Sequence, residues 1–299
     1  MDGIEGIGAS LNLSVGLLRF AQAADAGVVL PTLLQAIILG IVQGITEFLP
    51  ISSTAHLIIF TDIFHWRNVW DKAAIDAIQF GSVIAVVWYF RRDIHQILNG
   101  AWLAFEQKDW QRDEWKILVG IAIGTIPALA GGLILKVLDV ELDQALLIAV
   151  MSIAAAILLG LAEKIGIRKR GFDQLQVADG VLVGLGQMIA LLPGVSRSGS
   201  TLTTGLFLGL KRETAARFSF LLGLPTLTIA TLVQAKDVVS NPDMLLPLLV
   251  AIVSTFIFSY LSIAWLLRFL QRRSNWIFVW YRIALGVALL IAIANGVLR

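Results

Sequence analysis

The chain has 299 residues, of which 58% are hydrophobic and only 15% are charged. Soluble domains carry about 25% charged residues, so this composition excludes an ordinary soluble domain and indicates a membrane protein. The formal net charge of +2 is too small to indicate a nucleic-acid partner, and the absence of cysteine excludes disulfides and thiolate metal sites.

Residues 1–30 precede the first long apolar region. Their apolar stretch follows Asp2 and Glu5 and is interrupted by Arg19, whereas a secretory signal begins with basic residues and continues as an unbroken apolar run. We therefore expect an N-terminal extension that lies on the membrane surface as a helix, and not a signal peptide.

Six apolar segments approach the roughly 20 residues that a helix needs to cross a bilayer. Two other apolar regions, 31–63 and 174–210, are interrupted by Pro50 and Pro193 and by polar residues beside them. Each of these two regions predicts a pair of short helices with a break between them. The six predicted spans lie at about 73–90, 117–136, 145–162, 215–234, 244–267 and 276–297.

Lysine and arginine are concentrated in the segments 91–116, 163–173, 211–217 and 268–273. Cytoplasmic loops of membrane proteins are rich in these residues, and placing all four segments in the cytoplasm lets the six spans alternate without contradiction. Each broken region must then enter and leave on one side, as a re-entrant helix pair. The first pair enters from outside and the second from the cytoplasm.

The two breaks share a short pattern, in which Pro50 aligns with Pro193 and Ser53 with Ser196 at an offset of 143 residues. Each broken region is also followed by three spans. Chance recurrence of so short a pattern is the alternative. The matching topology favours two repeats of opposite orientation, as in many membrane transport folds.

The predicted fold class is therefore an all-α integral membrane protein. It is an inverted-repeat bundle of six full transmembrane helices plus two re-entrant helix pairs. The membrane domain is expected over 31–299, with repeats at about 31–140 and 174–299.

The first break reads GITEFLPISSTAHL and places Glu47 and His56 inside an apolar region. A charge at the bilayer centre costs about 2.5–3.5 kcal/mol on insertion scales, so Glu47 requires a function or a partner. A helix should restart near Ser53 or Thr54, and its N-terminus favours an anion. Ser53 and His56 are three residues apart, an arrangement that can activate a nucleophile or a water molecule. The alternative is that the serines only cap the helix and that His56 only forms a hydrogen bond within the bundle.

The second break reads PGVSRSGST and contains Arg197. Arginine binds phosphate through a planar fork of donors and stays protonated. Gly194 and Gly199 allow close approach of the backbone, and the helix expected to start near Ser200 again points its N-terminus at the break. These features predict phosphate binding. The alternative is a buried Arg197 paired with a carboxylate such as Glu47.

An inverted repeat brings two such breaks together near the middle of the membrane. Two helix N-termini and Arg197 would then converge beside Glu47 and His56. Such a site suits a phosphorylated ligand and proton transfer. A ligand that reaches it from the bilayer is expected to be a lipid phosphate.

The stretches QGITEFLPISSTAHL and PGVSRSGST resemble the two signatures of the undecaprenyl-diphosphate phosphatases, the bacitracin-resistance family. The glutamate motif of that family falls on Gln43 and Glu47, and RFSFLLGLPT at 217–226 is similar to its continuation. Gln43 stands where many relatives have glutamate. This position therefore predicts hydrogen bonding and not proton transfer, which puts a metal site with two carboxylates here in doubt. The resemblance covers roughly residues 31–299.

The resemblance implies a hydrolase that removes the terminal phosphate of undecaprenyl diphosphate and so recycles the carrier lipid for peptidoglycan synthesis, which lowers sensitivity to bacitracin. It implies a multi-pass protein of the bacterial inner (plasma) membrane with its active site on the outer side. The implied cofactor is a divalent cation, Mg²⁺ or Ca²⁺, with Glu47 as its ligand. The implied catalytic residues are Glu47, Ser53, His56 and Arg197, and the implied substrate-binding residues are Gln43, Ser52, Thr54, Ser196, Ser198, Gly199, Ser200 and Thr201.

Within this hypothesis Arg197 and the helix ends hold the diphosphate, and Glu47 orients His56 or the cation. Either Ser53 attacks the terminal phosphorus, or water attacks with His56 as the base. The expected partners are the undecaprenyl diphosphate substrate and membrane lipid, with a homodimer left open and no nucleic acid. A lipid-phosphate flippase or transporter is the alternative function, since an inverted repeat suits it equally well.

Overall fold

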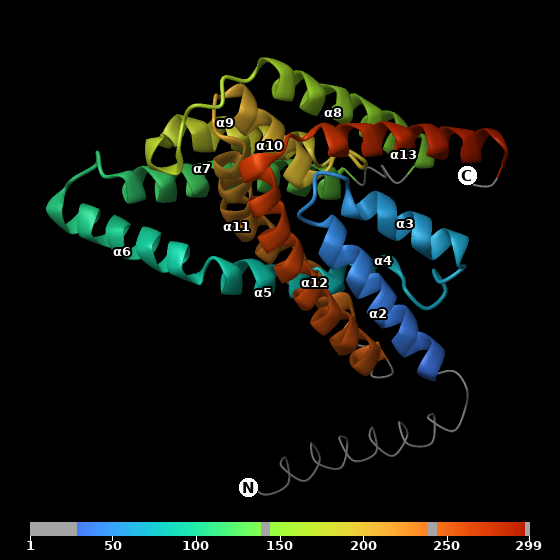
Figure 1. Ribbon diagram of the computed structural model, residues 1–299. Coiled ribbons are helices and arrows are strands. Elements are labelled where there is room, and N and C mark those ends of the chain that lie inside the picture. The colour runs from blue at the N-terminus through green and yellow to red at the C-terminus, as the bar shows by residue number, and fades with distance from the viewer. Residues whose placement is uncertain (1–28, 139–143, 239–243, 297–299) are drawn as a thin grey trace, which may run out of the picture.

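The computed structural model describes residues 29–138, 144–238 and 244–296, and within them the chain is helical (Figure 1). The predicted extension at 1–30 lies almost wholly outside these ranges. In the described part of the chain, extended pairing is limited to one bridge, between Arg170 and Leu210. The prediction of an all-α protein is confirmed.

The first half of the described chain contains α2 (Val29–Thr46), α3 (Ser53–Ile63), α4 (Lys72–Ile78), α5 (Phe80–Tyr89), α6 (Arg91–Gln107), α7 (Asp113–Val137) and α8 (Ala145–Ile165). The second half contains α9 (Val177–Ile189), α10 (Arg197–Phe207), α11 (Arg212–Val238), α12 (Leu245–Arg272) and α13 (Trp276–Ala294). The two broken regions of the sequence correspond to the pairs α2–α3 and α9–α10.

Six helical stretches are long and apolar enough to cross a membrane, which confirms the six predicted spans. They are Lys72–Tyr89, Asp113–Val137, Ala145–Ile165, Arg212–Val233, Leu245–Arg272 and Trp276–Ala294. The apolar parts of α2 and α9 are shorter, as expected for the broken regions. The basic connection predicted at 91–116 is itself largely helical, because α6 occupies most of it.

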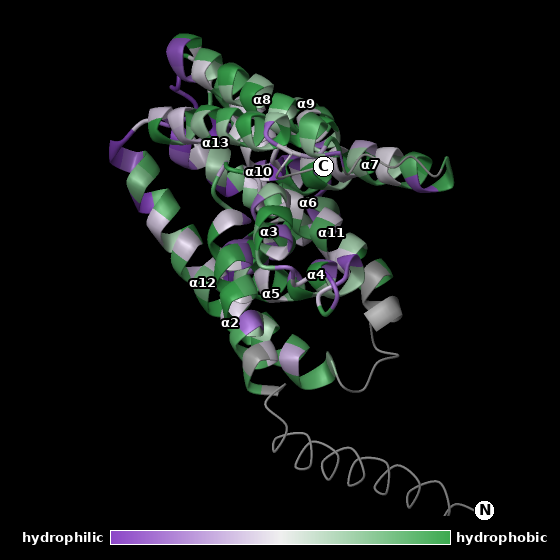
Figure 2. Cartoon of the chain, turned by 90° about the vertical axis from the view of Figure 1, so that its right-hand side faces the viewer, coloured by the Kyte–Doolittle hydropathy of each residue, from purple (hydrophilic) through white to green (hydrophobic). Residues whose placement is uncertain are grey.

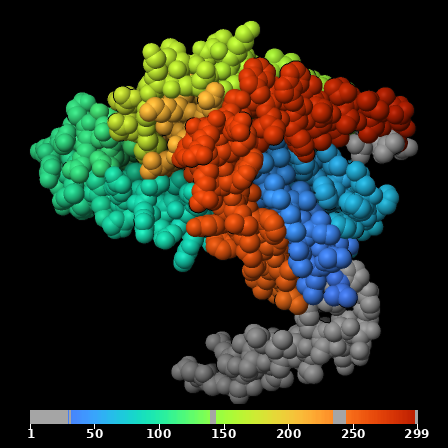
Figure 3. Space-filling view, viewed as in Figure 1, coloured from blue at the N-terminus to red at the C-terminus, as the bar shows by residue number. Residues whose placement is uncertain are grey.

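The first helix of each broken pair packs closely against a long span. Helix α2 packs on α12, beside which it runs in Figures 1 and 3, and α9 packs on α7. A methyl group added at Gly40 of α2 would come within 2.6 Å of the backbone oxygen of Ala251. At the other contact, a methyl group at Gly180 would come within 2.3 Å of the backbone oxygen of Gly120. Small residues of this kind let membrane helices approach closely, so both broken pairs are held by tight helix contacts.

The two ends of each broken pair lie close together. Trp70, beyond α3, donates from Nε1 to Oε1 of Gln35 in α2 at 3.1 Å. Arg170, which precedes α9, donates its backbone N–H to the carbonyl of Gly209, beyond α10, at 3.0 Å. Each pair therefore goes into the bundle and returns to the same end of it. Re-entry into a membrane, like the repeat boundaries, stays a prediction.

The basic segments meet at one end of the bundle. Glu163 at the end of α8 forms an ion pair with Arg212 at the start of α11, and its Oε2 accepts a hydrogen bond of 2.9 Å from Nδ2 of Asn275. Arg217 of α11 lies 2.8 Å from Asp93 of α6. Figure 2 shows hydrophilic residues gathered where α12 joins α13, on helices that are otherwise mainly apolar. This grouping agrees with the prediction that the basic segments share one side of the membrane.

Candidate active site

The first break begins where α2 ends, at Thr46, whose Oγ1 donates to the carbonyl of Val42 at 2.6 Å. Pro50 has no backbone N–H to continue the helix. Phe48 is fully buried and packs its ring edge-on against Phe220 of α11, with centroids 5.1 Å apart. The aromatic side chain therefore fixes the break in the core and leaves the neighbouring Glu47 at its edge.

Both breaks end in a serine with the same unusual backbone. Ser52 has φ 74° and Ser196 has φ 70°, in the left-handed region that non-glycine residues seldom occupy. Each serine caps the next helix, because its Oγ accepts a hydrogen bond from the backbone N–H three residues on.

These caps correct the sequence alignment, which paired Ser53 with Ser196. The second break contains one more residue than the first, so Ser52 matches Ser196, and Ser53 matches Arg197 as the first residue of the following helix. The helix after the second break also begins at Arg197 and not near Ser200.

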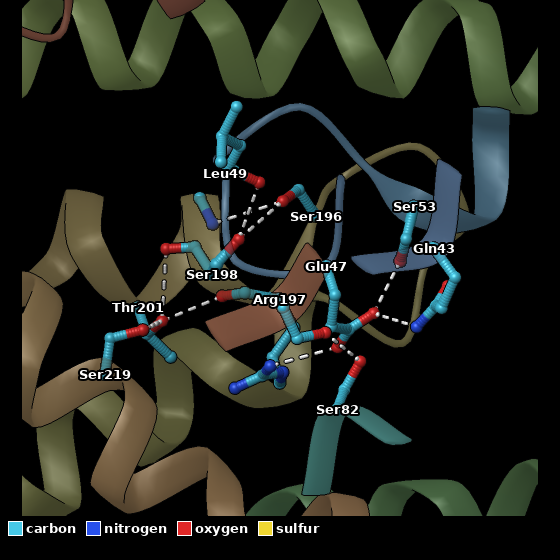
Figure 4. A network of polar contacts seen from close by, with 12 residues as sticks. Gln43, Glu47, Leu49, Ser53, Ser82, Ser196, Arg197, Ser198, Thr201 and Ser219 are labelled. Carbon is cyan, nitrogen blue, oxygen red and sulfur yellow. Dashed lines mark hydrogen bonds and ion pairs between the residues drawn. The ribbon is translucent and has the colours of Figure 1, made fainter. Parts of the chain in front are cut away.

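A single carboxylate joins the two breaks. Oε1 of Glu47 lies 3.0 Å from Nη2 of Arg197, and its Oε2 accepts hydrogen bonds from Oγ of Ser53 at 2.7 Å and from Nε2 of Gln43 at 2.9 Å. Figure 4 shows these three side chains converging on Glu47 from α2, α3 and α10. The structure thus brings together three of the four predicted catalytic residues, and it confirms the sequence alternative in which Arg197 pairs with Glu47.

The ion pair uses only part of the Arg197 guanidinium. Its Nε and Nη1 are buried and have no hydrogen-bond partner. Gly223 of α11 makes room for the group, since a methyl group there would overlap Nη1. Arg197 also lines the cavity described below, and a guanidinium that its carboxylate does not fully pair is suited to bind phosphate.

A cavity of about 230 Å³ lies at the junction of the two breaks, with room for a phosphate group and water. The predicted residues that line it are Glu47, Ser52, Ser53, Thr54, Ser196 and Arg197. Gln43 is fully buried behind Glu47 and supports it.

The cavity wall also contains Gln79, Gln187 and Thr226, which the sequence analysis missed. Nε2 of Gln187 donates to Oγ1 of Thr226 at 3.0 Å, while its Oε1 is buried without a partner. Gln187 is a polar residue in the apolar run before Pro193, as Gln43 is before Pro50. The matching positions of these two glutamines were the feature of the sequence that could have identified Gln187 as a site residue.

Four predicted substrate-binding residues, Ser198, Gly199, Ser200 and Thr201, lie outside the cavity lining. Oγ of Ser198 donates to the carbonyl of Leu49 at 3.0 Å and so ties the second break to the first. Oγ1 of Thr201 lies 2.5 Å from Oγ of Ser219 on α11. Successive residues of a helix point in different directions, so α10 directs these hydroxyls to the scaffold.

His56 also lies outside the cavity lining, and both of its ring nitrogens have partners. Nδ1 is 2.7 Å from the carbonyl of Ser52, and Nε2 is 2.6 Å from Oη of Tyr281 on α13. The ring is therefore turned toward α13. The sequence had suggested that His56 pairs with Ser53 or Glu47, and the structure shows no such pair. The sequence analysis named His56 as the base, but the group that contacts Ser53 is the Glu47 carboxylate.

The cavity offers few protein ligands for the implied divalent cation. Across the described residues, no group of three or more His, Asp or Glu side chains could hold a metal ion. Among the residues that the structure describes, Glu47 is the only carboxylate that lines the cavity. Mg²⁺ is commonly bound by one or two carboxylates together with substrate phosphates, so these residues fit a cation shared with a diphosphate and do not fit one held by protein ligands alone.

The profile of a protein family described as "Bacitracin resistance protein BacA" matches residues 36–288. The chain belongs to this family. Both breaks, the cavity and α13 as far as Arg282 lie within the matched range.

Curated relatives carry the name undecaprenyl-diphosphatase. The protein from Thermosynechococcus vestitus is 65% identical over 266 residues, which cover 89% of this chain and 97% of the relative. The protein from Trichormus variabilis is 50% identical over 286 residues, covering 93% of this chain and 89% of the relative. That from Synechocystis sp. is 47% identical over 288 residues, covering 92% and 88%.

The Glu47–Arg197 ion pair should contribute to the free energy of unfolding as well as to the chemistry of the site. Removing one partner of a buried ion pair costs at most about 3–5 kcal/mol, and a cavity that admits water reduces this cost. We expect Glu47→Ala to lower the free energy of unfolding in detergent, and the double variant Glu47→Ala/Arg197→Ala to recover part of the loss because no unpaired charge remains. The control is Glu106→Ala, an exposed glutamate of α6. A double variant no more stable than Glu47→Ala would contradict the pairing.

Proposed function

We propose that this chain hydrolyses undecaprenyl diphosphate to undecaprenyl phosphate and inorganic phosphate. By recycling the carrier lipid it would serve peptidoglycan synthesis and confer resistance to bacitracin. The observation that carries the proposal is a cavity lined by the Arg197 guanidinium in which the Ser53 hydroxyl is hydrogen-bonded to Glu47. The names of the relatives support the substrate.

Binding would rely on positive charge that is fixed in place. The Arg197 guanidinium would hold oxygens of the terminal phosphate, and the N-termini of α3 and α10 add the partial charge of their free backbone N–H groups. Such fixed groups stabilise the charge that develops on phosphoryl oxygens in the transition state.

The hydrogen bond between Ser53 and Glu47 supports a covalent route. Oγ of Ser53 would attack the terminal phosphorus while its proton passes to the carboxylate of Glu47. The bond from that phosphorus to the bridging oxygen breaks, and undecaprenyl phosphate leaves. Water then attacks the phosphoserine, and its hydrolysis releases inorganic phosphate and regenerates the Ser53 hydroxyl.

We also propose that the reaction uses a divalent cation, Mg²⁺ or Ca²⁺, which Glu47 would help to hold together with the phosphates of the substrate. When bound, it would offset the negative charge of the phosphate oxygens. The presence of one carboxylate in the cavity wall supports a cation that arrives with the substrate.

A transport function is not favoured. The relatives bear the name of a hydrolase. A hydroxyl held at 2.7 Å from a carboxylate is the arrangement that a chemical step requires and that passage of a lipid does not.

The proposed location is the plasma membrane, with the cavity open to the outer side. The grouping of basic segments at one end of the bundle supports a cytoplasmic location for that end.

Because the chain has no cysteine, a single Thr54→Cys substitution places one thiol at the cavity wall. We expect a membrane-impermeant maleimide to label it in intact spheroplasts. A cysteine at the exposed Arg272 should be labelled only after lysis. The reverse pattern would contradict this orientation.

Phosphate release from undecaprenyl diphosphate by the purified protein in detergent is the first test. We expect release by the wild type in the presence of Mg²⁺ or Ca²⁺, loss of release with a chelator, and none detectable with Arg197→Ala. Arg197→Lys should be nearly as impaired, because an ammonium group cannot replace the planar fork. No release by a folded wild type supplied with cation would refute the proposed function, and full activity of Arg197→Lys would refute fork binding.

The covalent route predicts that Ser53→Ala abolishes detectable turnover, because the substitution removes the nucleophile. Acid quenching during turnover of substrate labelled in its terminal phosphate should trap label on the wild type and none on Ser53→Ala. Thr54→Ala, the adjacent hydroxyl at the cavity, is the control and should still trap label. Retained activity in Ser53→Ala would instead favour direct attack by water.

A further inference from the structure

Arg282 is the one charged residue of α13, and its side chain is fully buried. It takes part in none of the ion pairs found among the described residues. Its Nη2 donates to the carbonyls of Gly194 and Val195, both at 2.8 Å. A buried charge at membrane depth is costly, and here the only partners found for it are two carbonyls of the second break.

These two carbonyls belong to the most distorted part of that break. Gly194 has φ 88° and the following cap, Ser196, has φ 70°. Irregular backbone inside a membrane protein needs internal hydrogen-bond partners, and the Arg282 guanidinium supplies them. It also packs against the start of α10, since a methyl group at Gly199 would come within 2.9 Å of Nη1. The backbone that presents Ser196 and Arg197 to the cavity therefore rests on this side chain.

The preceding residue, Tyr281, contacts the other break. Its Oη lies 2.6 Å from Nε2 of His56, and the two rings are nearly parallel, with an interplanar angle of 8°. A carbonyl can only accept, so Nδ1 of His56 must donate to Ser52. In the neutral ring Nε2 is then the acceptor, and the Tyr281 hydroxyl donates to it. This bond fixes the ring at the first turn of α3, where Ser53 also lies.

We propose that Tyr281 and Arg282 form a clamp on α13 that holds the two breaks in the arrangement needed for activity. Arg282 positions the second break and Tyr281 positions the first, through His56. Neither residue lines the cavity, so both are positioning residues. The consequence for activity rests on the proposed phosphatase function, whereas the consequence for the local structure does not.

The first readout is local structure, and it is independent of any substrate. Because the chain has no cysteine, Val195→Cys reports on the second break and Ala156→Cys, in the fully buried centre of α8, reports on the whole fold. Combining each with Arg282→Met should raise the rate of maleimide labelling at position 195 by about tenfold or more, as expected for local opening. Labelling at position 156 should not change.

The second readout is phosphate release per folded molecule. A misplacement of about 1 Å in a reacting group can cost about 100-fold in rate, so Arg282→Met should lower kcat/KM by about that factor. The matched control is Arg272→Met, an exposed arginine at the end of α12. Tyr281→Phe should lower kcat/KM by about tenfold, because it removes the one hydrogen bond from Tyr281 to His56. Its control is Tyr260→Phe, a tyrosine that packs on Tyr89.

Unchanged labelling at position 195 together with wild-type kcat/KM in Arg282→Met would overturn the clamp. Equal increases at positions 195 and 156 would assign Arg282 to global stability and would also overturn it. If Arg282→Met does not fold, Arg282→Lys takes its place, and the same labelling difference is required. A higher kcat/KM in Tyr281→Phe would show that the hydrogen bond from Tyr281 prevents His56 from acting as a base. That result would overturn the proposal that Tyr281 positions the first break for activity. Failure of the wild type to release phosphate refutes only the proposed function, because the labelling result stands alone.

Discussion

The ion pair between Glu47 and Arg197 is the contact on which the rest of the site depends. Each residue alone would be an uncompensated charge in an apolar region, and each comes from a different helix break. Pairing them forces the breaks together, and the second oxygen of Glu47 then accepts from Ser53 and Gln43. The pair also leaves two buried donors of Arg197 without a hydrogen-bond partner, and Arg197 itself lines the cavity. The contact that makes the charges tolerable inside the bundle thus creates a group able to bind phosphate.

The two breaks are built alike although their sequences differ. Both end in a serine with positive φ whose hydroxyl caps the following helix. The first helical residue then points at the shared carboxylate, as Ser53 in one break and Arg197 in the other. Similar local geometry with different side chains gives the site a hydroxyl from one half and a cation from the other. This division of roles fits a phosphoryl-transfer site better than a simple passage for lipid.

Support for the site also comes from contacts outside the cavity. Gly40 and Gly180 let the first helix of each broken pair approach its neighbouring span closely, so the breaks start from fixed positions. Arg282 supplies donors to the carbonyls of the second break, and Tyr281 fixes the ring of His56. Catalytic groups held in this way lose little orientation when the substrate binds. Under the proposed function, the long spans would contribute to the chemistry through the backbone that they hold.

The sequence by itself determined the six spans and the two breaks, and it identified Glu47 and Arg197 as charges in apolar regions that need a partner. Span length and hydropathy are local properties, and a charge in an apolar run has a cost that can be recognised without a structure. Only the tertiary structure decided the direction of each side chain. One additional residue in the second break shifted the alignment that had paired Ser53 with Ser196. Contacts between distant helices turned His56 toward α13 and brought polar residues such as Gln187 to the cavity. Such contacts depend on how helices pack, which spacing along the chain does not specify.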